Sequence, residues 1–340
     1  MEKMKFAIIG CEHAHITIFI EEMLQLGHIG IGIVEKRNME LASSLSEKYE
    51  IPLVDDEETL MAEADFIGCA AINNEKIAII ERCEQFGKSV MIDKPAVTNR
   101  QDAKRLEEVI ARKKIEVGML LTERFNPVIF TLQQQIVSGS LGEIVSIQMR
   151  KPHQLNAAKR PPWFFSKEQC GGIIIDLFIH DYDLLRWFTS SEVASSDGQM
   201  TKRNFPQYAG FYDTASMQVM MDNGVIAQLY ADWYTPDKSW TWGDGRIFVV
   251  GTEGVAELRL AGDPFVSKDA LLLQTTNVQQ AVQVPLIMPE HNITEDFLLR
   301  LNGKTSFIQA QDVMQATWAT IEADERVQIM QIPVVEGEKV

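Results

Sequence analysis

Short apolar runs alternate with amphipathic segments of helical length over the first 120 residues. The expected strands are residues 5–9, 29–34, 52–54, 65–71, 89–92 and 115–120. The expected helices between them are residues 16–26, 39–49, 75–86 and 100–113. Strands that are apolar nearly throughout and separated by helices are typical of a parallel sheet covered on both faces. The pattern therefore predicts a doubly wound α/β domain with six strands over residues 1–122.

The rhythm changes after residue 122. Helical patterns at 128–137, 172–188, 294–301 and 311–326 surround a series of β segments at 144–150, 214–221, 224–234, 246–251, 254–260 and 270–274. The tetrapeptide MDNG at 221–224 is a hairpin turn signal between two of them. Residues 123–340 are therefore predicted to form an α+β domain with a mainly antiparallel sheet.

Composition narrows the class of partner. The 340 residues suffice for two domains, and 48 acidic against 32 basic residues give a net charge of −16. Such a surface repels phosphate backbones and anionic lipids, so neither nucleic acid nor a membrane is the expected partner. The start lacks the features of a signal peptide, and no apolar run approaches the ~20 residues of a membrane span. Four scattered cysteines without a C-x-x-C pair indicate reduced thiols and a cytoplasmic location.

The turn after the first strand raises the question of a dinucleotide. Of the three glycines in a G-x-G-x-x-G fingerprint only Gly10 is present, while Glu12 and His15 occupy the other two positions. An ordinary strand-to-helix turn explains Gly10 equally well. Glu35 ends the second expected strand, near the spacing of the acid that binds ribose hydroxyls. It would repel a 2′-phosphate and favour NAD, although Lys36 and Arg37 keep NADP open and Glu35 could simply be a solvated strand end.

His13 and His15 raise the question of a metal. Two histidines at i, i+2 could ligate zinc, but the sequence shows no third and fourth ligand beside them, so we assign no metal. They are expected to line the cofactor or substrate cleft, or to be exposed.

The helix at 171–188 carries polar groups on an apolar background. Asp176, His180 and Asp183 share a narrow stripe at ~100° per residue, and buried carboxylates and imidazoles need partners. Asp176 and His180 could merely satisfy each other, and Asp183 could be a structural partner deeper in the helix. Lys94, however, follows the strand at 89–92, at the sheet edge where ligands of doubly wound folds bind. Beside a nicotinamide, His180 could exchange a proton, Asp176 orient it, and Lys94 polarise the reacting oxygen.

Together these segments resemble the Gfo/Idh/MocA oxidoreductases. MIDKPAV resembles the family's E-K-P motif, with Asp93 in place of Glu, and GGIIIDLFIHDYDLLRW resembles its GG-x(3)-D-x(3)-H-x(2)-D helix. ERFNP, SGSLGEIVSI, TWGDGRIFVVGTEGVAEL and EDFLLRLNGK are similar to further landmarks, so the resemblance covers nearly the whole chain. The glycine-poor turn and AAINNEK, where members often show T-P-N-x-x-H, depart from the pattern.

The resemblance implies an N-terminal Rossmann domain and a C-terminal domain whose large open sheet often forms a dimer, here a homodimer or homotetramer. It places Lys94, Asp176 and His180 at the active site, with Pro95 fixing the turn that presents Lys94. Expected cofactor contacts are Gly10, Cys11, Glu12, His13, Glu35, Lys36, Asn73, Asp93 and Lys94. Expected substrate contacts are Arg124, Asn126, His153, Trp163 and His180. Loop packing explains Trp163 at least as well as substrate contact does. A solvated face explains Arg124, Asn126 and His153 at least as well.

The function expected from these residues is an NAD(P)-dependent oxidoreductase. It would move hydride between nicotinamide and a carbinol carbon of a sugar, cyclitol or related polyol. Two alternatives remain: an NAD-dependent glycoside hydrolase that uses transient oxidation, and a non-enzymatic dinucleotide-binding regulator. The retained Lys94, Asp176 and His180 argue against the regulator, which needs no proton-transfer pair.

Overall fold

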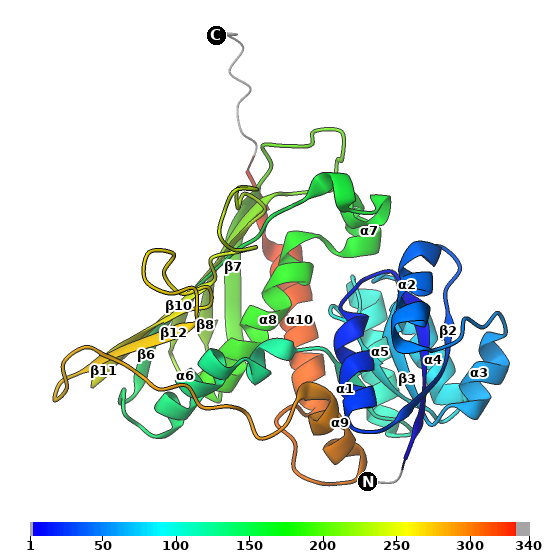
Figure 1. Cartoon of the computed structure of the whole chain (residues 1–340). Helices are drawn as coiled ribbons and strands as arrows, with labels where there is room; N and C mark the ends of the chain where they lie inside the picture. The colour runs from blue at the N-terminus through cyan, green and yellow to red at the C-terminus, as the bar shows by residue number, and fades with distance from the viewer. Residues whose placement is uncertain (1–2, 331–340) are drawn as a thin grey trace. The chain divides into compact units, whose positions relative to one another are not determined.

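The computed structural model describes residues 3–330, which divide into two compact units. The first unit comprises residues 1–127, 168–171 and 288–321, and the second comprises residues 128–167, 172–287 and 322–340. The units are thus interleaved along the chain, whose course from N- to C-terminus is coloured in Figure 1. Among the described residues, no helix is long and apolar enough to cross a membrane.

A parallel sheet of five strands forms the centre of the first unit, as far as residues 3–330 show. Its order is β2 (Ile29–Val34), β1 (Lys5–Cys11), β3 (Phe66–Ala70), β4 (Ser89–Ile92) and β5 (Val117–Met119). The connecting helices are α1 (Ile16–Gln25), α2 (Met39–Tyr49), α3 (Glu57–Glu63), α4 (Lys76–Gln85) and α5 (Arg100–Arg112). Every residue of β3 is buried, as expected for a strand covered on both faces. The predicted doubly wound Rossmann-type domain is confirmed.

The prediction of a sixth strand at residues 52–54 is wrong. Only Leu53 makes a single bridge, to Ile33, and its side chain is 40% exposed. Pro52 has no N–H to donate to a ladder. The chain instead turns into α3, which the pattern did not reveal, and Asp56 caps this helix by accepting from the Thr59 amide at 3.0 Å.

Two helices late in the sequence belong partly or wholly to the first unit: α9 (Ile293–Leu301) and most of α10 (Ala310–Arg326). Phe297 of α9 packs on Phe66, with ring centroids 5.3 Å apart. A Cβ at Gly118 would lie 2.6 Å from the Phe297 ring, so the glycine leaves room for this contact. The parallel sheet is therefore completed by residues far from it in sequence.

A mixed sheet dominates the second unit, with nine strands among the described residues. In spatial order they are β13 (Val282–Gln283), β12 (Leu271–Thr276), β11 (Gly254–Arg259), β10 (Arg246–Gly251), β6 (Ile144–Pro152), β9 (Ile226–Asp232), β8 (Thr214–Met221), β7 (Val193–Thr201) and β14 (Gln328–Ile329). Only the β6–β9 and β14–β7 pairs are parallel, again within residues 3–330. The prediction of a mainly antiparallel sheet is confirmed.

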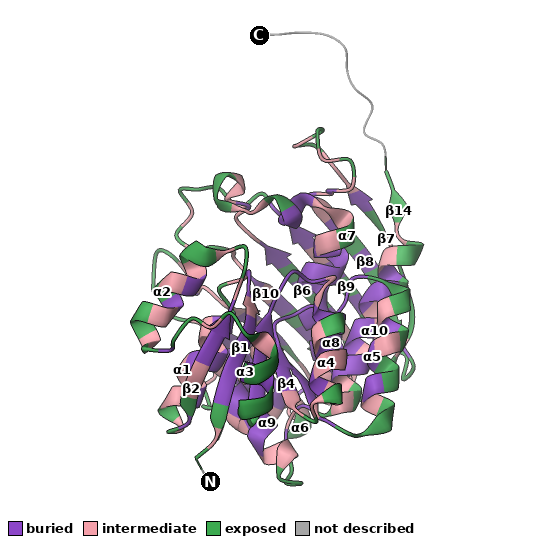
Figure 2. Ribbon diagram, turned by 90° about the vertical axis from the view of Figure 1, so that its right-hand side faces the viewer, coloured by how far each residue is buried: buried purple, intermediate pink, exposed green. Residues whose placement is uncertain are grey.

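One face of this sheet is covered and the other is open. Helix α8 (Gly172–Thr189) packs on β6, β8 and β9, and α6 (Pro127–Val137) belongs to the same unit from its second residue onward. Burial alternates along β8 and β9, so every second side chain points away from α8. Figure 2 colours the ribbon by the burial of each residue. The short helices η1 (Thr122–Phe125), η2 (Ala157–Lys159), η3 (Pro162–Phe165) and α7 (Lys167–Cys170) complete the chain.

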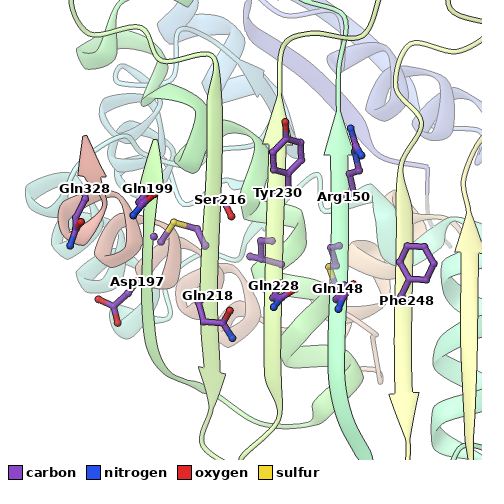
Figure 3. A pocket seen from close by; sticks show the side chains of 14 residues that line it. Gln148, Arg150, Asp197, Gln199, Ser216, Gln218, Gln228, Tyr230, Phe248 and Gln328 are labelled. Atoms are coloured by element: carbon purple, nitrogen blue, oxygen red, sulfur yellow. The ribbon is translucent and has the colours of Figure 1, made fainter. Parts of the chain in front are cut away.

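The open face is hollowed across its central strands. A depression of about 690 Å³ extends from β10 to β14, and its side chains project from the strands (Figure 3). Its polar lining is rich in glutamine: Gln148, Gln199, Gln218, Gln228 and Gln328. Phe248 adds an aromatic ring that is 37% exposed.

Candidate active site

The end of β1 turns at a glycine with positive φ. Gly10 adopts φ +76°, a conformation that side-chain-bearing residues rarely take. A Cβ there would lie only 2.6 Å from Cβ of Ala71, at the end of the neighbouring strand. Both constraints require glycine at this position, so the backbone itself explains the one fingerprint glycine that is present.

A cavity of about 350 Å³ opens at this edge of the first unit, a size that suits part of a small ligand. It is lined by Ile9, Gly10, Glu12, Val34, Glu35, Lys36, Arg37, Glu57, Ala71, Ile72, Glu75, Ala78, Ile79 and Arg82. The carboxyl ends of β1, β2 and β3 meet here, where doubly wound sheets bind their ligands. Four of the expected cofactor contacts, Gly10, Glu12, Glu35 and Lys36, are thereby brought together.

Glu35 is held in place by backbone amides. Its Oε2 accepts from the Cys11 N–H at 2.7 Å, and its Oε1 accepts from the N–H groups of Lys36 and Arg37, each at 2.8 Å. Burial alone would raise the pKa of Glu35, but these amides outweigh it and lower the pKa below its usual value. The carboxylate at the end of β2 is therefore ionised and fixed beside the cavity.

Arg37 is surrounded by acids. Its Nη2 donates to both carboxylate oxygens of Glu75 at 2.8 Å, and its Nη1 lies 3.9 Å from Oε1 of Glu12. The hydrogen bond to Glu75, opposed by burial and supported by Glu12 and Glu35, raises the pKa of Arg37. Arg37, one of the two cations that kept NADP open, is thus balanced within the protein.

The turn after β4 rests on a buried lysine that the sequence did not single out. Lys76 is fully buried, and its Nζ donates to the carbonyls of Asp93 at 2.7 Å and Pro95 at 3.1 Å, and to Oδ1 of Asn73 at 2.8 Å. Asn73 also donates to the Cys170 carbonyl at 2.9 Å. The signal was available in AAINNEK, where the lysine begins α4 on its buried side. Lys76 thus fixes the backbone on both sides of Lys94.

His13 and His15 both face Asp93. Their Nδ1 atoms lie 3.2 Å and 3.1 Å from Oδ2 and Oδ1 of Asp93, respectively. Burial alone would raise the pKa of Asp93, yet His13, Lys76 and His15 hold it well below its usual value. Burial lowers the pKa of His13, against the opposing effect of Asp93. The third potential metal ligand, which the sequence did not reveal beside the two histidines, comes from the end of β4.

The proton-transfer candidates lie on α8 in the second unit. Asp176 and His180 are each 9% exposed and Asp183 is 1% exposed, so all three are buried on a largely apolar helix, as the stripe predicted. Lys94 is 8% exposed and belongs to the first unit. That Lys94 meets Asp176 and His180 in one site stays a prediction.

A buried ion pair anchors α8 to the sheet. Nζ of Lys151, on β6, lies 3.2 Å from Oδ1 of Asp181, and both side chains are almost fully buried. Sequence reasoning missed this pair. Its signal was the alternation of β6, because Lys151 continues the inward positions of Ile147 and Met149.

The expected substrate contacts are dispersed. In the second unit, His153 follows β6, with its ring 5.7 Å from that of Trp233, and Trp163 is buried in η3. In the first unit, Arg124 is buried, donates to the Phe307 carbonyl at 2.7 Å and lies 3.2 Å from Asp312. Asn126 caps η1 through its backbone amide. Substrate contact by these four residues stays a prediction.

Two family models match the chain. Residues 4–120 match the NAD-binding Rossmann fold of an oxidoreductase family, and residues 129–257 match the GFO/IDH/MocA C-terminal domain. The NAD-binding Rossmann domain expected from the sequence is thereby confirmed.

Individual relatives extend this comparison. A scyllo-inositol 2-dehydrogenase (NAD(+)) from Bacillus subtilis is 27% identical over 52% of this chain and 49% of its own length. The matched region thus covers about half of that relative. A myo-inositol 2-dehydrogenase from Thermotoga maritima is 24% identical over 72% of this chain and 71% of its own length.

A protein of known structure from Erwinia carotovora atroseptica is 25% identical, with a TM-score of 0.88 over 97% of this chain and 100% of that one. The two family models match one segment in each structural unit, and the similarity to this solved structure extends over both units. The chain belongs to the Gfo/Idh/MocA family of oxidoreductases.

Proposed function

We propose that this protein is an NAD-dependent dehydrogenase that oxidises a carbinol carbon of a cyclitol or similar polyol. The observation that carries the proposal is the pair Asp176 and His180, one turn apart and buried on α8, in a chain with an NAD-binding Rossmann domain. Both side chains lie on a largely apolar helix that buries further ionisable groups. Such groups are costly to bury unless they are paired or serve a function, and proton transfer is one such function.

The residues at the end of β1 fit the cofactor. Gly10 keeps the backbone clear for close approach, and the neighbouring cavity of about 350 Å³ is bordered by the fixed carboxylate of Glu35. That carboxylate has the chemistry to accept from ribose hydroxyls and to repel a 2′-phosphate. NAD is therefore the preferred dinucleotide in this proposal, with Arg37 already paired to Glu75.

Each protein group has a separate task in the oxidation. NAD supplies the hydride acceptor. His180 takes the hydroxyl proton, Asp176 stabilises the imidazolium that forms, and Lys94 donates to the reacting oxygen. Lys76 keeps Lys94 in position through the carbonyls on either side of it.

The substrate class rests on the relatives. Both curated relatives described above are inositol dehydrogenases, and a cyclitol presents the ring of secondary alcohols that such a site would oxidise. The net charge of −16 favours such a neutral substrate over a phosphorylated one.

Two measurements test the proposal. Calorimetry should show NAD binding, and purified protein with NAD and myo- or scyllo-inositol should form NADH, seen by absorbance. Glycerol and glucose serve as comparison substrates. Tight NAD binding with release of a sugar from a glycoside, but no net NADH, would instead support the hydrolase. Absence of NAD binding would overturn the proposal.

We also propose that the chain assembles as a homodimer or homotetramer through the open face of the large sheet. This face has a hollow of about 690 Å³ and exposed apolar side chains among its glutamines (Figure 3). Monomeric proteins rarely leave such a surface uncovered.

A further inference from the structure

We propose that His13, His15 and Asp93 form a binding site for a transition-metal dication of the zinc class. Within residues 3–330, these three side chains form a group that could hold a metal ion, with one potential ligand atom from each and all three atoms within 4.8 Å of one another. The site goes beyond the proposed dehydrogenase activity and does not depend on it.

The distances suit a shared ion. With metal–ligand bonds of about 2.0–2.1 Å, the corners of a tetrahedron lie about 3.3 Å apart. The two imidazole Nδ1 atoms lie 3.2 Å and 3.1 Å from the two oxygens of Asp93. A dication bound between them would replace both contacts, with the side chains closing from ligand-atom separations within 4.8 Å to those of the tetrahedron.

The chemistry of the donor set is also suitable. Imidazole nitrogen and carboxylate oxygen are ligands of zinc, and three protein ligands leave a coordination position open. Asp93 is 2% exposed, whereas 27% of the His13 side chain and 45% of the His15 side chain are exposed. The carboxylate is thus held rigidly while an ion can enter from the histidine side.

Position in the fold suggests what fills the open coordination site. His15 is the N-cap of α1, and in doubly wound folds the dinucleotide pyrophosphate lies at this helix terminus. Two imidazoles and one carboxylate leave a bound dication with one net positive charge. We infer that the pyrophosphate of NAD completes the coordination, in a turn that has one of the three fingerprint glycines. This second step rests on the proposed NAD binding.

The first experiment uses tag-free protein that has been treated with chelator. Calorimetry with Zn²⁺ should give one ion per chain, and Co²⁺ as a substitute should give the visible absorption of a low-symmetry site. His13→Gln and His15→Gln should each weaken binding at least about 10–100-fold. His291→Gln is the matched control, because His291 also contacts one carboxylate, Asp296 at 2.8 Å, but lacks a second histidine.

The outcomes separate clearly. Wild-type protein that binds no Zn²⁺, or His13→Gln and His15→Gln proteins that bind it as tightly as the His291→Gln control, would overturn the site. Circular dichroism verifies that each variant is folded, and Asp93→Asn provides a third, nearly isosteric loss of a ligand.

The second experiment adds NAD to the Co²⁺ protein. A changed cobalt spectrum is expected if pyrophosphate becomes a ligand. An unchanged spectrum with NAD bound, as shown by calorimetry, would overturn the pyrophosphate step alone. Failure of NAD to bind would instead count against the proposed function, and the Zn²⁺ titration would still decide the metal site.

Discussion

Glu35 orders the turn after β1 and also borders the cavity that we propose for the dinucleotide. Its carboxylate accepts from the amides of Cys11, Lys36 and Arg37. The retained glycine alone would not have distinguished NAD from NADP. The structure adds that Arg37, which has the charge to bind a 2′-phosphate, instead donates to both carboxylate oxygens of Glu75.

We predict that NAD binds more tightly than NADP and that Glu35→Ala narrows the difference. Removal of the carboxylate removes its repulsion of the 2′-phosphate, and a change on the order of tenfold in the affinity ratio is expected, about 1.4 kcal/mol. Calorimetric titration of both dinucleotides measures it. Glu35→Gln is the matched variant, since it keeps the size and removes the charge. Equal affinities for the wild-type protein would contradict the role of Glu35.

The same residue predicts a pH dependence of stability. The pKa of Glu35 is lowered in the folded chain, against about 4.3 when unfolded. The ionised carboxylate therefore stabilises the folded state above about pH 4.3, and this contribution disappears as pH falls through the folded pKa. Urea unfolding from pH 7 to pH 3 should show a larger loss of unfolding free energy for wild type than for Glu35→Gln. Parallel curves would exclude the effect.

The proposed proton transfer makes a prediction about three variants, once a substrate is known. His180→Ala should lower kcat by ~10²–10⁴-fold, the usual contribution of general acid–base catalysis. Dinucleotide affinity should hardly change, because His180 lies outside the Rossmann domain. Asp176→Asn should retain substrate binding better than turnover, and Lys94→Ala should impair both. Steady-state kinetics measures each. A fully active His180→Ala enzyme would show that His180 is only a packed core residue.

At the scale of elements, the ion pair between Lys151 and Asp181 fixes the helix that carries His180. Asp181 follows His180 directly, so displacement of α8 on β6 would also displace the proposed catalytic pair. A buried ion pair is costly to break from one side, because the remaining charge has lost its partner.

We therefore predict that Lys151→Met lowers the unfolding free energy by about 3–5 kcal/mol. The double variant Lys151→Met/Asp181→Leu should recover most of this loss, because neither charge is then left buried. Denaturant unfolding of the two single variants and the double variant gives the coupling energy. Additive losses in the double variant would mean that the two side chains act independently.

The sequence predicted an element where its apolar pattern showed clearly which residues are buried. The strands of the Rossmann sheet are apolar throughout, so five of six were found, and Pro52 shows why the sixth failed. By contrast, β7 (VASSDGQMT) was missed because it lies near one end of the large sheet and buries few of its residues, so its sequence has no clear apolar alternation. The polar stripe of α8 was visible because helical periodicity is local. Partners such as Asp93 for His13, or Asp181 for Lys151, lie far along the chain and only the fold brings them together.

At the scale of the whole molecule, the large sheet has one face that no helix covers among the described residues. Met220, Ile226 and Phe248 are each 37–41% exposed on strands β8, β9 and β10. The surrounding glutamines offer neutral hydrogen-bond donors and acceptors, which suits a self-complementary contact in a protein of high negative charge. Most soluble oligomers are homo-oligomers, so a second copy of this chain is the expected partner for this face.

We predict a homodimer or homotetramer at micromolar concentration and its dissociation in Phe248→Glu. The new carboxylate would lose its water in the interface, and the two copies would bring two added negative charges into one contact, so both desolvation and repulsion oppose assembly. Sedimentation velocity measures the change in mass. Phe265→Glu is the matched control, because Phe265 is 97% exposed outside the strands and should leave assembly intact. A wild-type monomer, or an unchanged oligomer in Phe248→Glu, would show that this face is not the interface.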